Sequence, residues 1–144
     1  MALAELRVGM RHEETLLVTE RVTVSEVLER FEPGMDMPAV FGTAYLVGFV
    51  EWTCMRLLAP YLEPRQRSLG TRVDLSDRAA TLVGMKVTAE VRLEGVDGRR
   101  LRFRVVCRDE AEVICEGDHE RFVVEVERFL KGLEKKQDGL GAGG

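Results

Sequence analysis

Apolar and polar residues alternate over much of the second half of the chain, with the period of two that is typical of β-strands. The alternation is clearest at residues 71–75, 87–93 and 101–107, and a last strand is predicted over residues 112–126. Each strand has one apolar and one polar face, which indicates an antiparallel sheet with one face in water. Turns are expected at residues 96–98 and 109–111, and Gly117 predicts a bulge or bend in the last strand.

One long apolar segment, residues 40–58, departs from this alternation and predicts a helix. Its only charged residues are Glu51 and Arg56, and Pro60 follows its end. A helix that is apolar nearly all round must be covered on several sides. Gly48 at its centre lowers helix propensity by about 1 kcal/mol relative to alanine, which is usually tolerated where a neighbouring backbone comes close.

The remaining segments complete the expected order of elements. Residues 11–19 predict a first strand, residues 23–31 a short helix that Thr23 could cap, and residues 32–38 a mobile covering loop rich in proline and methionine. Residues 127–136 predict a short closing helix, so one domain is expected over residues 1–136, with a flexible glycine-rich tail over 137–144. A strand, a long helix and a run of antiparallel strands is the order of an α+β hot-dog fold, whose sheet curls around one central helix. The open edge of such a sheet favours a homodimer or a dimer of dimers.

Composition narrows the class of protein. The chain has 144 residues and a formal net charge of −4, which argues against nucleic-acid binding. No apolar run approaches the length of a membrane span, and the first residues lack the features of an export signal, so a cytoplasmic protein is expected. Asparagine is absent and glutamine occurs twice, which hints at a thermophilic source.

Cysteine and histidine positions predict neither a disulfide framework nor a metal site. Cys54, Cys107 and Cys115 are odd in number and form no Cys-x-x-Cys pair, so they are interpreted as small core residues. His12 and His119 lie far apart without clustered ligand partners, and both are interpreted as structural. We expect no metal and no separate cofactor.

Candidate chemistry lies on and beside the long helix. Thr43 stands near its start, where a hydroxyl group and free backbone N–H groups could face a ligand, although threonine is a favoured cap residue and an ordinary N-cap is the simpler interpretation. Glu51 has no cation three or four residues away, so its carboxylate should be partly desolvated, which suits a general base or nucleophile. The alternative is a Glu51 that emerges into water or meets Arg56.

Asp77 has the same strand parity as Val73 and Leu75, so its side chain is expected to point inward. The alternative is a strand-end aspartate paired with Arg72 or Arg78.

Four sequence stretches resemble the fluoroacetyl-CoA thioesterase family of hot-dog enzymes, in order and spacing from about residue 7 to 129. They are FGTAYLVGFVEWTC at 41–54, LAPYLEP at 58–64, SLGT at 68–71 and GDHER at 117–121. The resemblance implies a catalytic threonine at Thr43, a catalytic glutamate at Glu51 and an acyl-pocket glycine at Gly70. It also implies a histidine at the position of Asp77, and aspartate cannot donate a hydrogen bond as histidine does unless it is protonated.

This difference leaves the role of Asp77 open. Two inward carboxylates, Glu51 and Asp77, can share one proton if they lie close together. Alternatively, Asp77 positions a water molecule, or catalysis is lost. Phenylalanines of the family's lid fall at Gly34 and Met37 here, so a small or medium acyl chain is expected rather than a fluorinated one.

We therefore expect an acyl-CoA thioesterase with CoA as part of its substrate. Thr43, Glu51 and Asp77 are the predicted catalytic residues, and the predicted substrate contacts are Gly70, Met37, Phe41, Arg65 and Arg67, the arginines as partners of CoA phosphates. The main alternative is a hot-dog protein that binds an acyl-CoA or another small ligand without turnover. A dehydratase or hydratase is disfavoured because the helix contains no histidine, and a purely structural dimer leaves Glu51 unexplained.

Overall fold

A computed structural model of the chain describes residues 2–143. Its elements are the short 3-10 helices η1 (Leu3–Glu5), η2 (Glu20–Val22) and η3 (Ala59–Tyr61), the α-helices α1 (Val24–Leu28), α2 (Thr43–Leu58) and α3 (Val126–Gly143), and the strands β1 (Arg11–Leu17), β2 (Gln66–Asp77), β3 (Lys86–Asp97), β4 (Arg100–Arg108) and β5 (Val113–Glu125).

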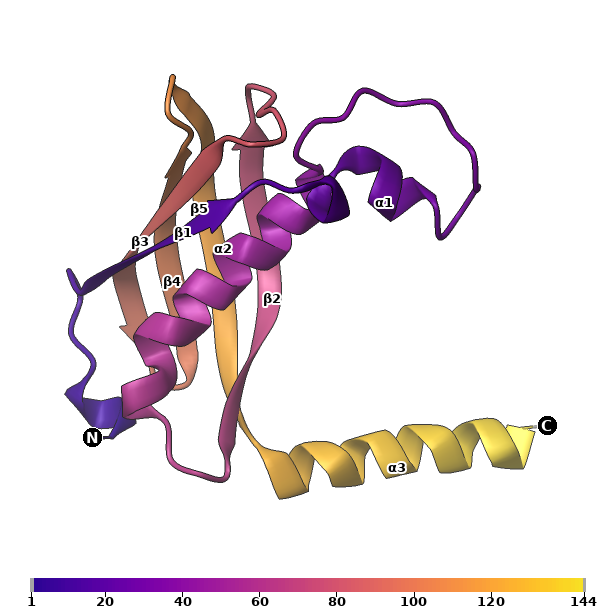
Figure 1. Cartoon of the computed structure of the whole chain (residues 1–144). Coiled ribbons are helices and arrows are strands. Elements are labelled where there is room, and N and C mark those ends of the chain that lie inside the picture. Colours follow the sequence, from indigo (N-terminus) through magenta and orange to yellow (C-terminus); the bar gives the residue numbers. More distant parts are fainter. Residues whose placement is uncertain (1, 144) are drawn as a thin grey trace.

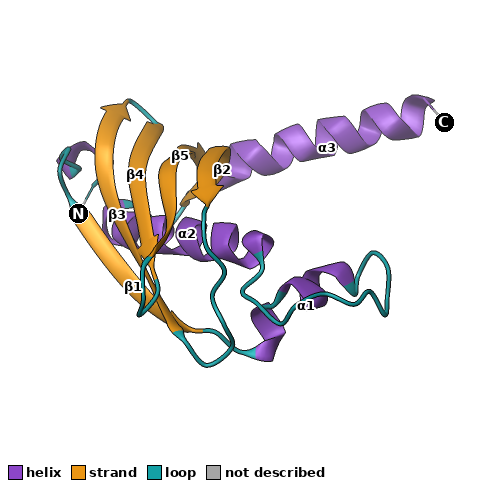
Figure 2. Ribbon diagram, turned by 90° about the horizontal axis from the view of Figure 1, so that it is seen from above, coloured by secondary structure: helices purple, strands orange, loops and turns teal. Residues whose placement is uncertain are grey.

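The five strands form one antiparallel sheet in the order β1-β3-β4-β5-β2, and the sheet curls around α2 (Figures 1 and 2). This confirms the predicted sheet around one central helix. The core lies between the helix and the inner face of the sheet, where apolar side chains of α2, β3 and β4 are fully buried. Its largest fully buried apolar residues are Leu46, Leu58, Leu93, Leu101 and Phe103.

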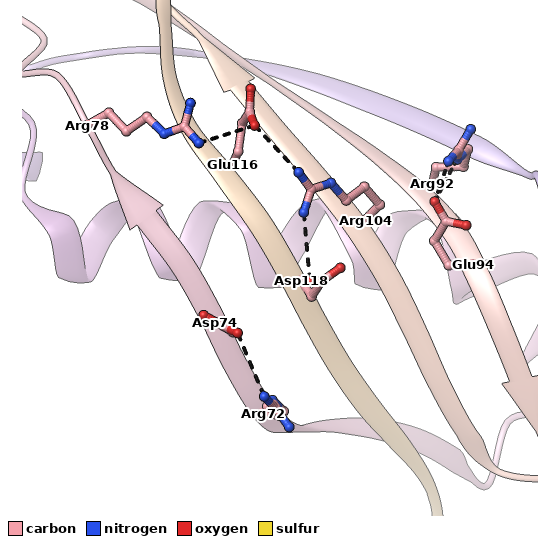
Figure 3. Close-up of polar contacts among 8 residues, drawn as sticks. All are labelled: Arg72, Asp74, Arg78, Arg92, Glu94, Arg104, Glu116 and Asp118. Carbon is pink, nitrogen blue, oxygen red and sulfur yellow. Dashed lines mark hydrogen bonds and ion pairs between the residues drawn. The ribbon is translucent and has the colours of Figure 1, made fainter.

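The outer face of the sheet is polar, as the alternating pattern predicts. Arg104 lies between Glu116 and Asp118, with nitrogen–oxygen distances of 3.5 and 3.7 Å, and Arg78 reaches the same Glu116 at 3.4 Å (Figure 3). These ion pairs are largely solvated, so each adds little to stability. They keep one face of the sheet wet and leave the other face for the helix.

Strand β2 ends the sheet and has no neighbour on its outer edge within residues 2–143. Next to it, α2 presents an exposed surface that includes Gly48, Trp52 and Met55, and Val73 of β2 is also exposed. No atom outside the helix lies within 4 Å of a methyl group built on Gly48, so residues 2–143 do not provide the close neighbour expected there. A single chain thus leaves one side of its central helix uncovered.

Two segments differ from the sequence-based expectation. Residues 29–39 are exposed and arch away from the sheet, so they do not cover the helix in a single chain (Figure 1). Helix α3 continues to Gly143, through residues where the glycine content predicts a flexible tail. It leaves the end of β5 and extends past β2 (Figures 1 and 2).

Gly117 marks a close approach between two strands, and the register between β2 and β5 shows no shift there, so the predicted bulge is absent. A Cβ atom at this position would lie 2.0 Å from the carbonyl oxygen of Asp74 and 2.8 Å from the Cα of Leu75. Real Cβ atoms essentially never come so close to backbone, and the backbone cannot move aside as a flexible side chain could.

Replacing Gly117 with alanine should therefore force β2 away from β5. We expect Gly117→Ala to lower the free energy of unfolding by at least about 2 kcal/mol, measured by urea denaturation. Gly132→Ala is the matched control, because Gly132 lies in α3 with open space around it, and there alanine should stabilise the helix by about 0.5–1 kcal/mol. Equal stability of the two variants would contradict the close approach.

Candidate functional site

Thr43 is the first residue of α2, and its side chain does not cap the helix. Gly42 occupies the N-cap position without a side-chain hydrogen bond, so the N-cap explanation of Thr43 is wrong. The hydroxyl group of Thr43 instead donates a hydrogen bond of 2.7 Å to Oδ2 of Asp77, at the end of β2. Asp77 thus points toward the helix as its parity predicts, but both residues are exposed.

Glu51 lies in the second half of α2 and contacts a cation that its own helix does not provide. Nη1 of Arg121, on β5, donates a hydrogen bond of 2.9 Å to Oε2 of Glu51. The Glu51 side chain is 36% exposed, whereas that of Arg121 is 3% exposed. Glu51 is therefore half-buried, and it has a cation beside it that comes from another strand. Arg56, the partner considered from the sequence, contacts Glu14 instead.

The guanidinium group of Arg121 joins three elements of the fold. Its Nε donates to the hydroxyl of Ser68 and its Nη2 to the carbonyl oxygen of Ser68, both at 2.8 Å. Its Nη1 reaches Glu51 and also lies 3.1 Å from Nε2 of His119. A buried arginine needs such partners, because an unpaired buried charge costs several kcal/mol. Here the partners come from α2, β2 and β5.

His119 is fully buried, as a structural histidine should be, but it lies inside this cluster. Its Nδ1 lies 2.8 Å from the carbonyl oxygen of Arg72, which can only accept, so Nδ1 carries the proton. In the neutral ring Nε2 is then an acceptor for Arg121. Burial lowers the pKa of His119, and the positive charge of Arg121 lowers it further, so the ring is neutral at neutral pH.

Gly70 completes the cluster because a β-bulge turns it toward the helix. The register between β2 and β5 shifts between Gly70 and Arg72, so the parity of the strand changes at this point. Gly70 and Asp77, which sequence parity assigns to opposite faces, therefore both face α2. A Cβ atom on Gly70 would lie 2.6 Å from Oε2 of Glu51 and 3.3 Å from Cε1 of His119.

The predicted catalytic residues thus fall into two groups on the same side of the sheet. Thr43 and Asp77 lie at the amino end of α2, and Glu51 is eight residues along the helix, about 12 Å further on. Glu51 is bound to Arg121 and Asp77 to Thr43. Within one chain, then, the two carboxylates do not form the proton-sharing pair considered from the sequence.

The predicted substrate contacts are only partly brought together. Arg67 lines a groove of about 460 Å³ whose other residues include Met55, Leu62 and Ser68, so this groove adjoins the Arg121 cluster. Arg65 lies in a different groove, beside α3. Phe41 is buried in the core and Met37 is exposed on the arching loop, so neither lines this groove in a single chain.

Thiol groups and metal-ligating side chains are a second possible source of chemistry. All three thiols are free and buried, and burial raises the pKa of Cys54, the thiol near Arg121 and Glu51. That thiol is protonated and is a poor nucleophile. No group of three or more histidine, cysteine, aspartate or glutamate side chains in the described part of the chain is placed to hold a metal ion. None of the described helices is long and apolar enough to cross a membrane.

Sequence reasoning missed Arg121 and His119 as site residues. Both belong to the GDHER stretch that carries part of the family resemblance, and both have the strand parity of the buried Val123 on the inner face of β5. A charged residue at an inward strand position requires a partner. That parity was the signal that could have identified Arg121 and suggested a carboxylate near it.

Comparison with known proteins identifies relatives along most of the chain. Residues 18–127 match the family model described as fluoroacetyl-CoA-specific thioesterase, FlK. A fluoroacetyl-CoA thioesterase from Streptantibioticus cattleyicolor is 39% identical over 131 residues, which cover 91% of this chain and 94% of that protein.

Solved structures agree with this assignment. A structure of the fluoroacetyl-CoA thioesterase FlK has 39% identity and a TM-score of 0.87, over 91% of this chain and 97% of that one. A hot-dog-like protein from Thermanaerovibrio acidaminovorans has 21% identity and a TM-score of 0.78, over 91% and 93% of the two chains, and supports the fold alone. The predicted α+β hot-dog fold is confirmed.

The buried position of Arg121 leads to a stability prediction. Arg121→Met leaves Glu51 and both acceptors of Ser68 without their partner, so we expect the free energy of unfolding to fall by about 3 kcal/mol in urea denaturation. Arg72→Met is the matched control, because Arg72 forms an ion pair with Asp74 in which both side chains are mostly exposed. Arg72→Met should lower the free energy of unfolding by at most about 1 kcal/mol. Similar losses in the two variants would contradict a structural role for the buried guanidinium.

Proposed function

Because this chain belongs to the fluoroacetyl-CoA-specific thioesterase family, we propose that it hydrolyses the thioester bond of an acyl-CoA. Water and the thioester are consumed, and a carboxylic acid and the free thiol of CoA are formed. The observation that carries the proposal is the half-buried carboxylate of Glu51, which Arg121 holds against the backbone at Gly70.

Glu51 is proposed as the general base or nucleophile of this reaction. Arg121 contacts its Oε2 and thereby fixes the direction of the carboxylate. Oε1 has no protein partner among the described residues, so it is free to take a proton from water or to attack the thioester carbonyl. A positioned base contributes about a hundredfold to ten-thousandfold to the rate of such a step.

Thr43 is proposed to act together with Asp77. A hydroxyl group has one hydrogen, and that of Thr43 is donated to Asp77, so its oxygen is left as an acceptor or nucleophile. The negative charge that develops on the thioester oxygen would then be stabilised by the backbone N–H groups at the start of α2, which point toward the same end of the helix. In this arrangement Asp77 orients the threonine, the role that a carboxylate can fill in place of the family's histidine.

Two copies of the chain are proposed to complete the site. The free edge of β2 and the exposed surface of α2 at Gly48, Trp52 and Met55 both lack a neighbour in the described chain, and pairing two β2 edges about a twofold axis supplies one to each. If the axis passes between residues 73 and 74, Asp77 of one copy lies opposite Gly70 of the other. The Thr43–Asp77 pair of one chain would then face the Glu51–Arg121 pair of its partner.

The acyl group is proposed to be small or medium in size and not fluorinated. The arching loop carries Gly34 and Met37 where the family resemblance implies phenylalanines, so the lid differs where it would meet the acyl chain. Arg67, at the rim of the groove beside Ser68, is proposed to contact a CoA phosphate. A cytoplasmic location and a thermophilic source stay predictions from composition.

Removing the carboxylate without changing its shape tests the central role. In Glu51→Gln the amide oxygen can still accept from Arg121, so the fold should be retained while thiol release from acyl-CoA substrates falls at least about a hundredfold. Glu14→Gln is the control, because Glu14 contacts Arg56 on the other side of the same helix, and it should leave the rate unchanged. If Glu51→Gln keeps its activity, Glu51 is not the base. If acyl-CoA raises the melting temperature of the wild-type protein but no thiol is released, the alternative holds, and the protein binds acyl-CoA without hydrolysing it.

Mixing two inactive variants tests whether the site spans two chains. Thr43→Val and Glu51→Gln should each be nearly inactive alone. When the two are coexpressed with different tags, half of the dimers are mixed, and each mixed dimer contains one intact site and one with both changes. We expect recovery of about one quarter of wild-type activity in the mixture. No recovery would mean that both residues act within one chain.

A further inference from the structure

His119 is a buried polar side chain whose two ring nitrogens both bind protein groups. Nδ1 contacts the carbonyl oxygen of Arg72 at 2.8 Å and Nε2 contacts Nη1 of Arg121 at 3.1 Å. The imidazole is fully buried, so it does not touch a substrate. Any buried imidazole needs partners for its nitrogens, so the informative point is which groups those partners are: the bulged backbone of β2 and the arginine that binds Glu51.

The contact with Arg121 determines where the guanidinium points. Ser68 holds Nε and Nη2 of Arg121 on one side of the planar group, and Nη1 has two hydrogens left to place. One of them is donated to Glu51 and the other to Nε2 of His119. Without an acceptor at the Nε2 position, Nη1 keeps an unpaired buried N–H. Rotation of the guanidinium group away from Glu51 would then lower its free energy.

The contact with Arg72 ties the ring to the bulge on β2. The ladder between β2 and β5 is interrupted between Gly70 and Arg72, and His119 supplies a donor to the Arg72 carbonyl at that interruption. The same ring lies 3.3 Å from the position of a Cβ atom on Gly70. His119 therefore fixes the distance between the β2 backbone at Gly70 and the guanidinium that orients Glu51.

We propose that His119 is a positioning residue for thioester hydrolysis, which acts through Arg121 to aim Glu51 across the backbone of Gly70. This role requires a neutral ring that is protonated on Nδ1, because a hydrogen atom on Nε2 would point at the hydrogen atom of Nη1. The groups facing the ring are Arg121, Glu51 and the backbone of Arg72, with Glu120 next along its own strand. The inference rests on the proposed function, because the effect of His119 is measured as a change in the rate of acyl-CoA hydrolysis.

Two amide replacements separate the two contacts. The amide of glutamine reaches the place of Nε2 and can accept from Arg121, whereas the amide of asparagine reaches the place of Nδ1 and can bind only the Arg72 carbonyl. We expect His119→Asn to lower kcat by about tenfold to a hundredfold with KM within twofold of the wild type. His119→Gln should retain kcat to within about threefold. His12→Asn is the control, because His12 lies on β1 and hydrogen-bonds Glu14 rather than any residue of the Arg121 cluster.

The melting temperatures of both variants separate positioning from folding. Equal losses of kcat in His119→Asn and His119→Gln at equal stability would overturn the proposal, as would a loss confined to KM. If the wild-type protein hydrolyses no acyl-CoA, the proposed function is overturned instead. The wild-type assay precedes the variants, so the two outcomes are distinguished.

A measurement on the unmodified protein covers the case in which both variants unfold. ¹⁵N NMR of the wild type reports which ring nitrogen of His119 carries hydrogen at pH 7. Protonation on Nδ1 with a bare Nε2 is the expected result. Hydrogen on Nε2 would overturn the proposal whatever the variants do.

Discussion

The structure depends most on one buried cation. Arg121 is almost completely removed from water, so its charge and its N–H groups have to be met by protein groups. Ser68 on β2, His119 on β5 and Glu51 on α2 meet them, and in doing so they join the edge of the sheet to the central helix. The interaction that satisfies the guanidinium also fixes a carboxylate at the surface of the helix. Stability and the geometry of the site therefore have the same origin.

The same half of the molecule has a free sheet edge and an exposed helix surface among residues 2–143. The sheet stops at β2, the helix exposes an apolar surface beside it, and the Thr43–Asp77 pair lies a helix segment away from Glu51. An unpaired strand edge and an exposed apolar surface are energetically unfavourable, and the Thr43–Asp77 pair is too far from Glu51 to act with it in one chain. The proposed edge-to-edge pairing would address all three at once, because it would satisfy strand N–H and C=O groups, bury apolar surface and bring unlike halves of the site together.

The sequence predicted most of the fold because its patterns are local. The period-two alternation and the single apolar helix identify the sheet, its wet face and the element inside it, and the inward direction of Asp77 follows from parity. The bulge after Gly70 could not be predicted, because it depends on pairing with β5, and it alone brings Gly70 to the face of Asp77. The partner of Glu51 was missed for a related reason, since Arg121 is seventy residues away and only tertiary contacts bring them together. The helical course of α3 beyond residue 136 likewise contradicts what its glycine content favours.

The backbone contact at Gly117 has a consequence for redesign. Strands β2 and β5 lie against each other there with no room for even one methyl group, and farther along they carry Gly70 on one strand and His119 and Arg121 on the other. The spacing of the two strands is therefore fixed at Gly117, and side chains of α2 and of the arching loop do not enter that contact. A change of acyl preference should accordingly be sought in those two segments, while β2 and β5 are left as an invariant scaffold.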